Sequence, residues 1–351
     1  VWWAYLVVLV GTALLCAVLT STAMRTVGLW ITTDLQNRHQ ELTRDLGGSS
    51  IVVAFVVAVP VTSKIRPLAG GREEIFTVVA VTVLLLVVGL VGDSRRVLPS
   101  WHLGAEIAGA VVISSSGLGI ALVRSDTVNL FLNILWFVAI ANAFKLINHP
   151  IGLAKGVATV TCFSLFALAS TNGQVLVATL SIALAGSTAG LFSRTIHKDE
   201  VLPGESSIGT IGFLIAFLAI QVDGPVNRIE GLANALMPIL VCSFVLFNLA
   251  WVIVARLLAR GGAEQIRQGG VSYELLAIGF RLSAVKSWSF FIAGAVGVLS
   301  YVIYRIDQTV GMLLVGLIGL VYLIGGVLLV KASPRGEDRQ KNYAILERHQ
   351  P

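Results

Sequence analysis

Polar side chains that could carry chemistry stand at the ends of long apolar stretches in this sequence. Asp93 ends one stretch in the run GLVGDSRR, and Glu205 opens another in PGESSIGTIGF. A third polar run, NAFKLINHPIGLAKG, covers residues 142–156, and His39 lies in the polar segment 25–46. Burying ionisable groups at such places is costly unless they have a role. These carboxylate, imidazole, amide and ammonium groups are therefore the first candidates for a functional site.

Residue spacing argues against two common kinds of site. His102, His149 and His197 are scattered along the chain, and none has the spacing of zinc ligands. No GxGxxG or Walker sequence opens a helix after a strand pattern, which excludes a soluble nucleotide-binding fold. The chemistry must therefore come from the polar groups at the ends of the apolar stretches.

The composition places these groups in a membrane protein. Of 351 residues, 56% are hydrophobic and 13% are charged, and the mean hydropathy is +0.86. Soluble domains carry about 25% charged residues. The net charge of +6 is explained by cationic loops that orient membrane spans, so nucleic-acid binding is not expected.

Apolar stretches of about 17 to 25 residues, the length that crosses a bilayer, predict eleven spans. We therefore expect an all-α, polytopic transmembrane bundle with one domain over 1–330 and a charged cytoplasmic tail over 331–351. The predicted spans are 1–24, 47–63, 75–92, 103–123, 128–144, 151–170, 175–192, 206–222, 232–255, 287–303 and 309–330.

The cations predict how these spans are oriented. Of the 25 lysines and arginines, 19 fall in the tail or in the loops after odd-numbered spans, and six fall on the opposite side. Because Lys and Arg are retained in cytoplasmic loops, we expect the N-terminus outside and the C-terminus in the cytoplasm. The protein is then a multi-pass protein of the cytoplasmic (inner) membrane, with its polar clusters on the cytoplasmic face.

The cytoplasmic loops match a known series of motifs in order. Gly28, Leu29, His39, Gly47 and Gly48 fit GLVDxPNxRKxHxGPxPxxGG without a gap. Residues 92–94 fit the end of GLxDD, residues 142–156 fit NAxNxxDGxDGLAxG, and residues 204–213 fit GDxGSxxLGF. On these motifs the chain resembles the polyprenyl-phosphate N-acetylhexosamine-1-phosphate transferases of the glycosyltransferase family 4 type, which include phospho-N-acetylmuramoyl-pentapeptide transferase.

The resemblance implies a reaction and its partners. A sugar 1-phosphate would move from a UDP-N-acetylhexosamine to polyprenyl phosphate in cell-envelope polysaccharide synthesis, releasing UMP. Because two anionic phosphates must meet, the resemblance implies Mg²⁺ held by Asp93 and Glu205, which would also be the catalytic residues. The resemblance is also compatible with a homodimer. The implied substrate-binding residues are His39, Asn142, Lys145, Asn148, Gly204 and Ser206.

Several positions depart from the motifs. Ser94 replaces the second aspartate of GLxDD, while Asn148 and Ile151 replace the two aspartates of DGxDG. Lys145 replaces an asparagine, and residues 270–273 replace the HxHH run of the last loop. This depleted active site leaves a second hypothesis open, namely a catalytically inactive paralogue that binds a lipid phosphate or a partner enzyme.

Each candidate residue also has a purely structural interpretation. Asp93 could pair with a neighbouring arginine, and Glu205 could stabilise the positive end of a helix. Lys145 could be a cytoplasmic anchor cation. Glu106, early in the fourth span, could extend to the interface or pair with His102, and the sequence suggests no functional role for it.

Overall fold

The computed structural model describes residues 2–30, 48–60, 72–95, 100–148, 153–196, 204–222, 232–258, 270–306 and 308–332. For some residues at helix ends, among them Asp93, only the backbone is described. His39 and the predicted tail after Ala332 lie outside these ranges. The described segments form helices and turns and contain no strand, which confirms the predicted all-α fold.

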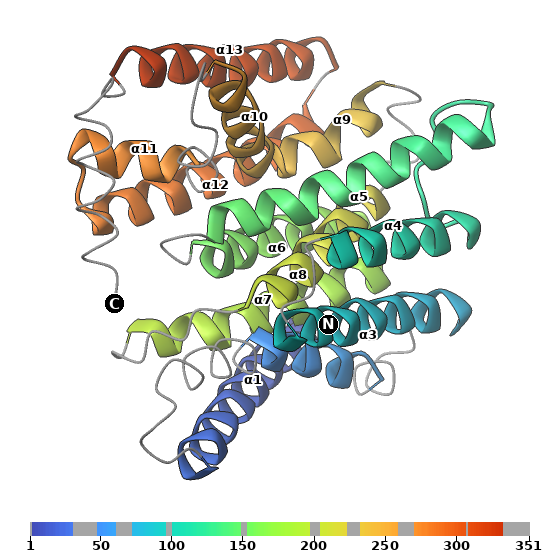
Figure 1. The fold of residues 1–351 in the computed structure, drawn as a ribbon. Helices are drawn as coiled ribbons and strands as arrows, with labels where there is room; N and C mark the ends of the chain where they lie inside the picture. The colour runs from blue at the N-terminus through green and yellow to red at the C-terminus, as the bar shows by residue number, and fades with distance from the viewer. Residues whose placement is uncertain are drawn as a thin grey trace.

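Each of the eleven predicted spans contains a helix, and the helices form one layered bundle (Figure 1). In chain order they are α1 (Trp2–Trp30), an unlabelled helix (Gly48–Pro60), α3 (Arg72–Arg95), α4 (Ser100–Ser115), α5 (Asp126–Asn148), α6 (Ala154–Thr171), α7 (Val175–Ile196), α8 (Glu205–Gln221), α9 (Leu232–Val241), α10 (Ser243–Leu258), α11 (Val271–Ile278), α12 (Leu282–Arg305) and α13 (Gln308–Ala332).

The predicted ninth span is broken into α9 and α10. Pro238 lies inside α9, where it has no backbone N–H to donate and its ring crowds the preceding turn. The chain then turns at Cys242, whose backbone N–H donates to the Pro238 carbonyl at 3.1 Å. This local break lets α9 and α10 point in different directions (Figure 1).

A short helix, α11, lies in the long loop between α10 and α12. Its first backbone N–H, on Val271, donates to the side-chain carbonyl of Asn248 on α10 at 2.8 Å. Gly279 ends it with a left-handed backbone (φ 108°), a conformation that glycine adopts without strain. The cap comes from a different helix, so local sequence patterns gave no sign of α11.

The helix α8 lies at the centre of the bundle. Every residue from Ser206 to Ala219 is buried, and α8 contacts α3, α5, α6, α7 and α9. The Phe213 ring stacks on Phe137 of α5 with centroids 4.4 Å apart. A helix that is apolar on all sides is expected at such a buried position. Ser206 and Ser207 of its first turn lie inside the bundle, while Glu205 is exposed.

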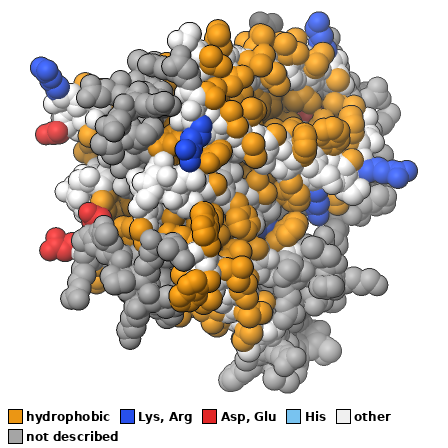
Figure 2. Space-filling model, turned by 180° about the vertical axis from the view of Figure 1, so that it is seen from behind, with side chains coloured by type: hydrophobic (Ala, Val, Ile, Leu, Met, Phe, Trp, Pro, Cys, Tyr) orange, Lys and Arg blue, Asp and Glu red, His pale blue; other side chains and the backbone are white. Residues whose placement is uncertain are grey.

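The outer surface of the bundle is apolar. Among the described residues, seven helices are long and apolar enough to cross a membrane, and three shorter apolar helices accompany them. Hydrophobic side chains cover much of the face in Figure 2, and charged side chains stand mainly toward its rim. A soluble monomer rarely exposes an apolar surface this large, so the protein is a multi-pass membrane protein.

Close contact between α5 and α8 depends on Gly212. A β-carbon there would lie 2.9 Å from Cα of Ala141 and 3.2 Å from the Ile140 carbonyl oxygen, both backbone atoms that cannot move aside. We expect Gly212→Ala to destabilise the protein by about 1–3 kcal/mol because it forces the two helices apart. Thermal unfolding in detergent checks this. Gly104→Ala on α4 is the control, since no atom lies within 4 Å of its added carbon, and equal stability of the two variants would contradict the prediction.

Candidate functional site

The ends of α3, α4 and α8 that carry polar residues meet at one end of the bundle. A β-carbon on Gly89 of α3 would lie 2.5 Å from Cβ of Ser206, in the first turn of α8. One turn further along α3, a β-carbon on Gly92 would lie 2.9 Å from Nε2 of His102 on α4. The glycines allow this close approach, which brings the backbone of Asp93 beside α4 and near the start of α8.

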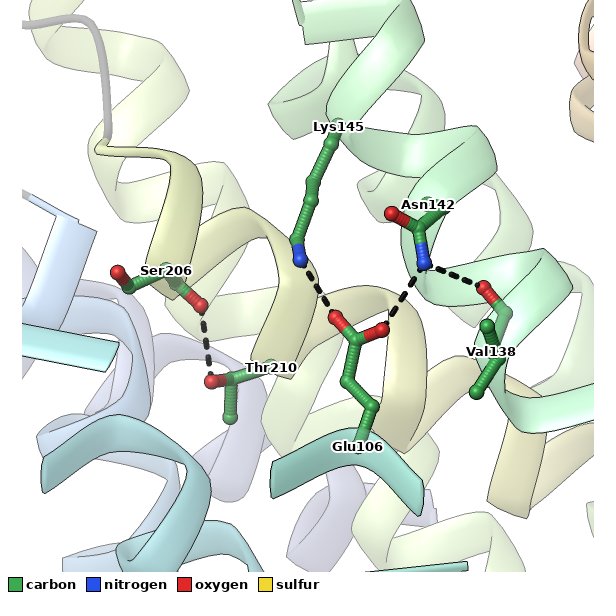
Figure 3. Close-up of polar contacts among 6 residues, drawn as sticks. All are labelled: Glu106, Val138, Asn142, Lys145, Ser206 and Thr210. Carbon is green, nitrogen blue, oxygen red and sulfur yellow. Dashed lines mark hydrogen bonds and ion pairs between the residues drawn. The ribbon is translucent and has the colours of Figure 1, made fainter. Parts of the chain in front are cut away.

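At the same end, Glu106 of α4 is held by two residues of α5. Its Oε1 lies 2.5 Å from the Lys145 ammonium, and its Oε2 accepts a hydrogen bond from the Asn142 amide at 2.9 Å (Figure 3). The side chains of Glu106 and Lys145 are 5% and 16% exposed. Both oxygens of a buried carboxylate are thus satisfied, as an acid inside a membrane bundle requires. We call these three residues the Glu106 cluster.

The Glu106 cluster lies directly against α8. A β-carbon on Gly209 would overlap Cε of Lys145 and would lie 3.3 Å from Oε1 of Glu106. Gly209 therefore leaves the space that the lysine side chain fills. Because Gly209 is one turn from Glu205, the cluster joins α4, α5 and the polar start of α8 in one place (Figure 3).

The remaining predicted site residues lie at the same helix ends. Gly204 precedes α8, Glu205 is its first residue and is exposed, and Ser206 is buried against α3. An acid in the first turn also suits the positive end of the helix dipole, so this structural interpretation stays open. Asn148 is the last residue of α5 and is 8% exposed. The predicted role of His39 falls outside the described residues.

One expectation from the sequence is corrected here. Glu106 pairs with Lys145 and Asn142 rather than with His102, although His102 is only one turn away on α4. The reason is the way α4 faces α5 across the bundle. The sequence did carry a signal, since an acid inside an apolar stretch needs a partner, but it could not show which neighbouring helix supplies that partner.

Residues 75–223 match the sequence model of glycosyl transferase family 4. This stretch begins in α3 and ends just after α8, so it contains every helix that forms the Glu106 cluster. The Glu106 cluster therefore lies inside the region that matches the family model.

Named relatives align over most of the chain. A Bacillus subtilis protein named "Probable undecaprenyl-phosphate N-acetylglucosaminyl 1-phosphate transferase" is 23% identical over 253 residues, 69% of this chain and 68% of that one. The decaprenyl-phosphate N-acetylglucosaminephosphotransferase of Mycobacterium tuberculosis is 24% identical over 332 residues, which are 86% of this chain and 81% of that protein. The Mycobacterium leprae protein of that name is 25% identical over 271 residues, which are 69% of this chain and 68% of that protein. The chain is thus similar to glycosyl transferase family 4 over residues 75–223 and to these relatives over most of its length.

Phosphotransferases such as these relatives generally use a divalent metal, so the side chains at this end of the bundle are compared with a metal site. Mg²⁺ is held by one or more carboxylates together with water and phosphate oxygens. The described residues contain no group of three His, Cys, Asp or Glu side chains that could hold a metal ion. Both oxygens of Glu106 are already bonded, which leaves Glu205 as the described carboxylate at this end. By themselves these residues do not fit a magnesium centre.

Proposed function

We propose that the protein transfers N-acetylglucosamine 1-phosphate, or a related N-acetylhexosamine 1-phosphate, from its UDP derivative to polyprenyl phosphate. An oxygen of the lipid phosphate attacks the phosphorus next to the sugar, the bond from that phosphorus to the UMP oxygen breaks, and UMP leaves. The names of the relatives support this reaction, because they specify undecaprenyl or decaprenyl phosphate and N-acetylglucosamine.

The observation that carries the proposal is the meeting of α3, α4, α5 and α8 at their polar ends. Lys145, held by Glu106, supplies N–H donors there, and Asp93 and Glu205 stand at the neighbouring ends of α3 and α8. A site at helix ends suits a lipid acceptor, since the polyprenyl tail can stay in the bilayer while its phosphate reaches the polar groups. We place this site at the cytoplasmic face, following the distribution of cations.

The resemblance also implies Mg²⁺ at Asp93 and Glu205, and this stays a prediction because the described side chains do not by themselves fit a magnesium centre. When bound, such an ion would neutralise charge on the phosphates. The described side chains make up only part of a donor set, so no step of the reaction is assigned to the ion. A chelator arm in the assay tests the requirement directly.

The inactive paralogue is the second candidate, and one observation favours it. Glu106 and Lys145 neutralise each other inside the bundle, while Asn148 and Ile151 take the places of motif aspartates. A scaffold of this kind would still bind a lipid phosphate without transferring a sugar.

One assay separates the two candidates. The purified full chain in detergent receives UDP-N-acetylglucosamine and undecaprenyl phosphate, with Mg²⁺ or with EDTA, and UMP release is measured. We expect UMP only when both substrates are present, and EDTA should abolish its release. If no UMP forms with any of several UDP-N-acetylhexosamines while undecaprenyl phosphate still binds, the transferase proposal is wrong and the paralogue takes its place.

A further inference from the structure

We infer that Lys145, positioned by Glu106 and Asn142, binds the phosphate of the lipid acceptor, and that this contact needs no divalent cation. The inference rests on the proposed function for the identity of the lipid. The resemblance implies that Mg²⁺ supplies the positive charge at the phosphates. Here, a side chain of the protein supplies the positive charge at the lipid phosphate instead.

The geometry of Lys145 leaves donors for a ligand. Its ammonium has three N–H groups, and one of them bonds Oε1 of Glu106 at 2.5 Å. Within the described part of the chain no second acceptor is bonded to this nitrogen. The side chain is 16% exposed, against 5% for Glu106. The lysine side chain is therefore partly open, whereas its carboxylate partner is shielded.

Glu106 and Asn142 hold Lys145 rather than compete with a ligand. Both carboxylate oxygens accept bonds, one from Lys145 and one from the Asn142 amide, which also donates to the Val138 carbonyl at 2.9 Å. Glu106 is thus fixed between two residues of α5, and the lysine stem lies over Gly209. A side chain fixed in this way loses little further conformational freedom when it binds phosphate.

The charge balance explains why a metal is not required for this contact. The Glu106 cluster is neutral as a whole, so a phosphate that approaches Lys145 meets no unpaired carboxylate within the cluster. Relative to the motif NAxNxxDGxDG, Lys145 adds one positive charge, and Asn148 and Ile151 each remove the negative charge of an aspartate. The net charge of this segment is therefore three units more positive, against the two units that a bound Mg²⁺ would supply. Lysine binds phosphate as a compact point charge and needs no fixed fork geometry.

The test measures binding of undecaprenyl phosphate to the purified full chain in nanodiscs, separately with EDTA and with Mg²⁺. We expect equal affinity in both conditions. Lys145→Met should weaken binding about tenfold or more, the value of a hydrogen bond to a charged group. Glu106→Gln should bind at least as tightly as the unaltered chain, because the counter-charge of the lysine is gone. Undecaprenol and inorganic phosphate serve as competitors that separate the lipid tail from the phosphate.

Matched variants distinguish binding from structural support. If the pair only supports the fold, Lys145→Met and Glu106→Gln should weaken binding alike, and that result would overturn the inference. The double variant Glu106→Gln/Lys145→Met buries no charge and keeps a polar group beside Asn142, so it should fold and still bind weakly. Lys331→Met, at the exposed end of α13, should leave the affinity unchanged.

Parallel measurement of UMP release separates this inference from the proposed function. Binding that depends on Mg²⁺ or is unaffected by Lys145→Met overturns the lysine site, and the transferase stands if UMP is still released. Absence of UMP release with lipid binding that depends on Lys145 overturns the transferase and supports the lysine site. Absence of lipid binding in every condition overturns the lysine site, whatever UMP release shows.

Discussion

Lys145→Met is expected to destabilise the protein by about 3–5 kcal/mol, because it leaves the Glu106 carboxylate buried without its counter-charge. The remaining partner of Glu106 is the Asn142 amide, which contacts only one of the two oxygens. A charge in this position must either stay unpaired or take up a proton, and both cost free energy. The midpoint of thermal unfolding in detergent should fall by several degrees.

The double variant is the decisive comparison for this prediction. Glu106→Gln/Lys145→Met removes both charges and keeps side chains of similar size, so most of the lost stability should return. Lys331→Met removes an exposed lysine at the end of α13 and should change stability by no more than about 0.5 kcal/mol. Equal losses in the single and the double variant would mean that Glu106 and Lys145 are not energetically coupled.

Asp93→Asn is expected to lower UMP release about a hundredfold or more. The substitution puts a neutral amide of the same size in place of the carboxylate that we propose to act at the reacting phosphates. The backbone of Asp93 lies at the end of α3, one residue after Gly92, which packs against His102. The substitution should leave the thermal stability nearly unchanged. Loss of turnover without loss of stability is therefore the predicted result.

The same helix offers the control. Glu74 is an exposed acid in the first turn of α3, at the opposite end from Asp93. Glu74→Gln removes one negative charge from the same element and should leave UMP release unaltered. Full UMP release by Asp93→Asn would exclude a role for this carboxylate, and comparable losses in both variants would point to a general effect of charge.

The sequence was sufficient to predict the all-α fold and most of its helices, and to indicate the similarity to glycosyl transferase family 4. Apolar stretches of bilayer length predict helices because a chain in lipid must satisfy its backbone hydrogen bonds within each segment. Each of the eleven predicted spans contains a helix, although α4 ends at Ser115, before the predicted end of its span at residue 123. The polar loops pointed to the polyprenyl-phosphate transferases, and the match over residues 75–223 agrees. The orientation in the membrane and the roles of Asp93, Glu205 and His39 stay predictions.

Contacts between helices depended on the tertiary structure. Three features involve groups that are brought together by packing. They are the break between α9 and α10, the cap that Asn248 gives to α11, and the pairing of Glu106 with Lys145 rather than with His102. Glu106 and Lys145 are 39 residues apart in the chain. Hydropathy reports how long and how apolar a segment is, which is a local property. Which faces of α4, α5 and α8 meet is decided by side-chain packing across the whole bundle, and that packing alone formed the Glu106 cluster.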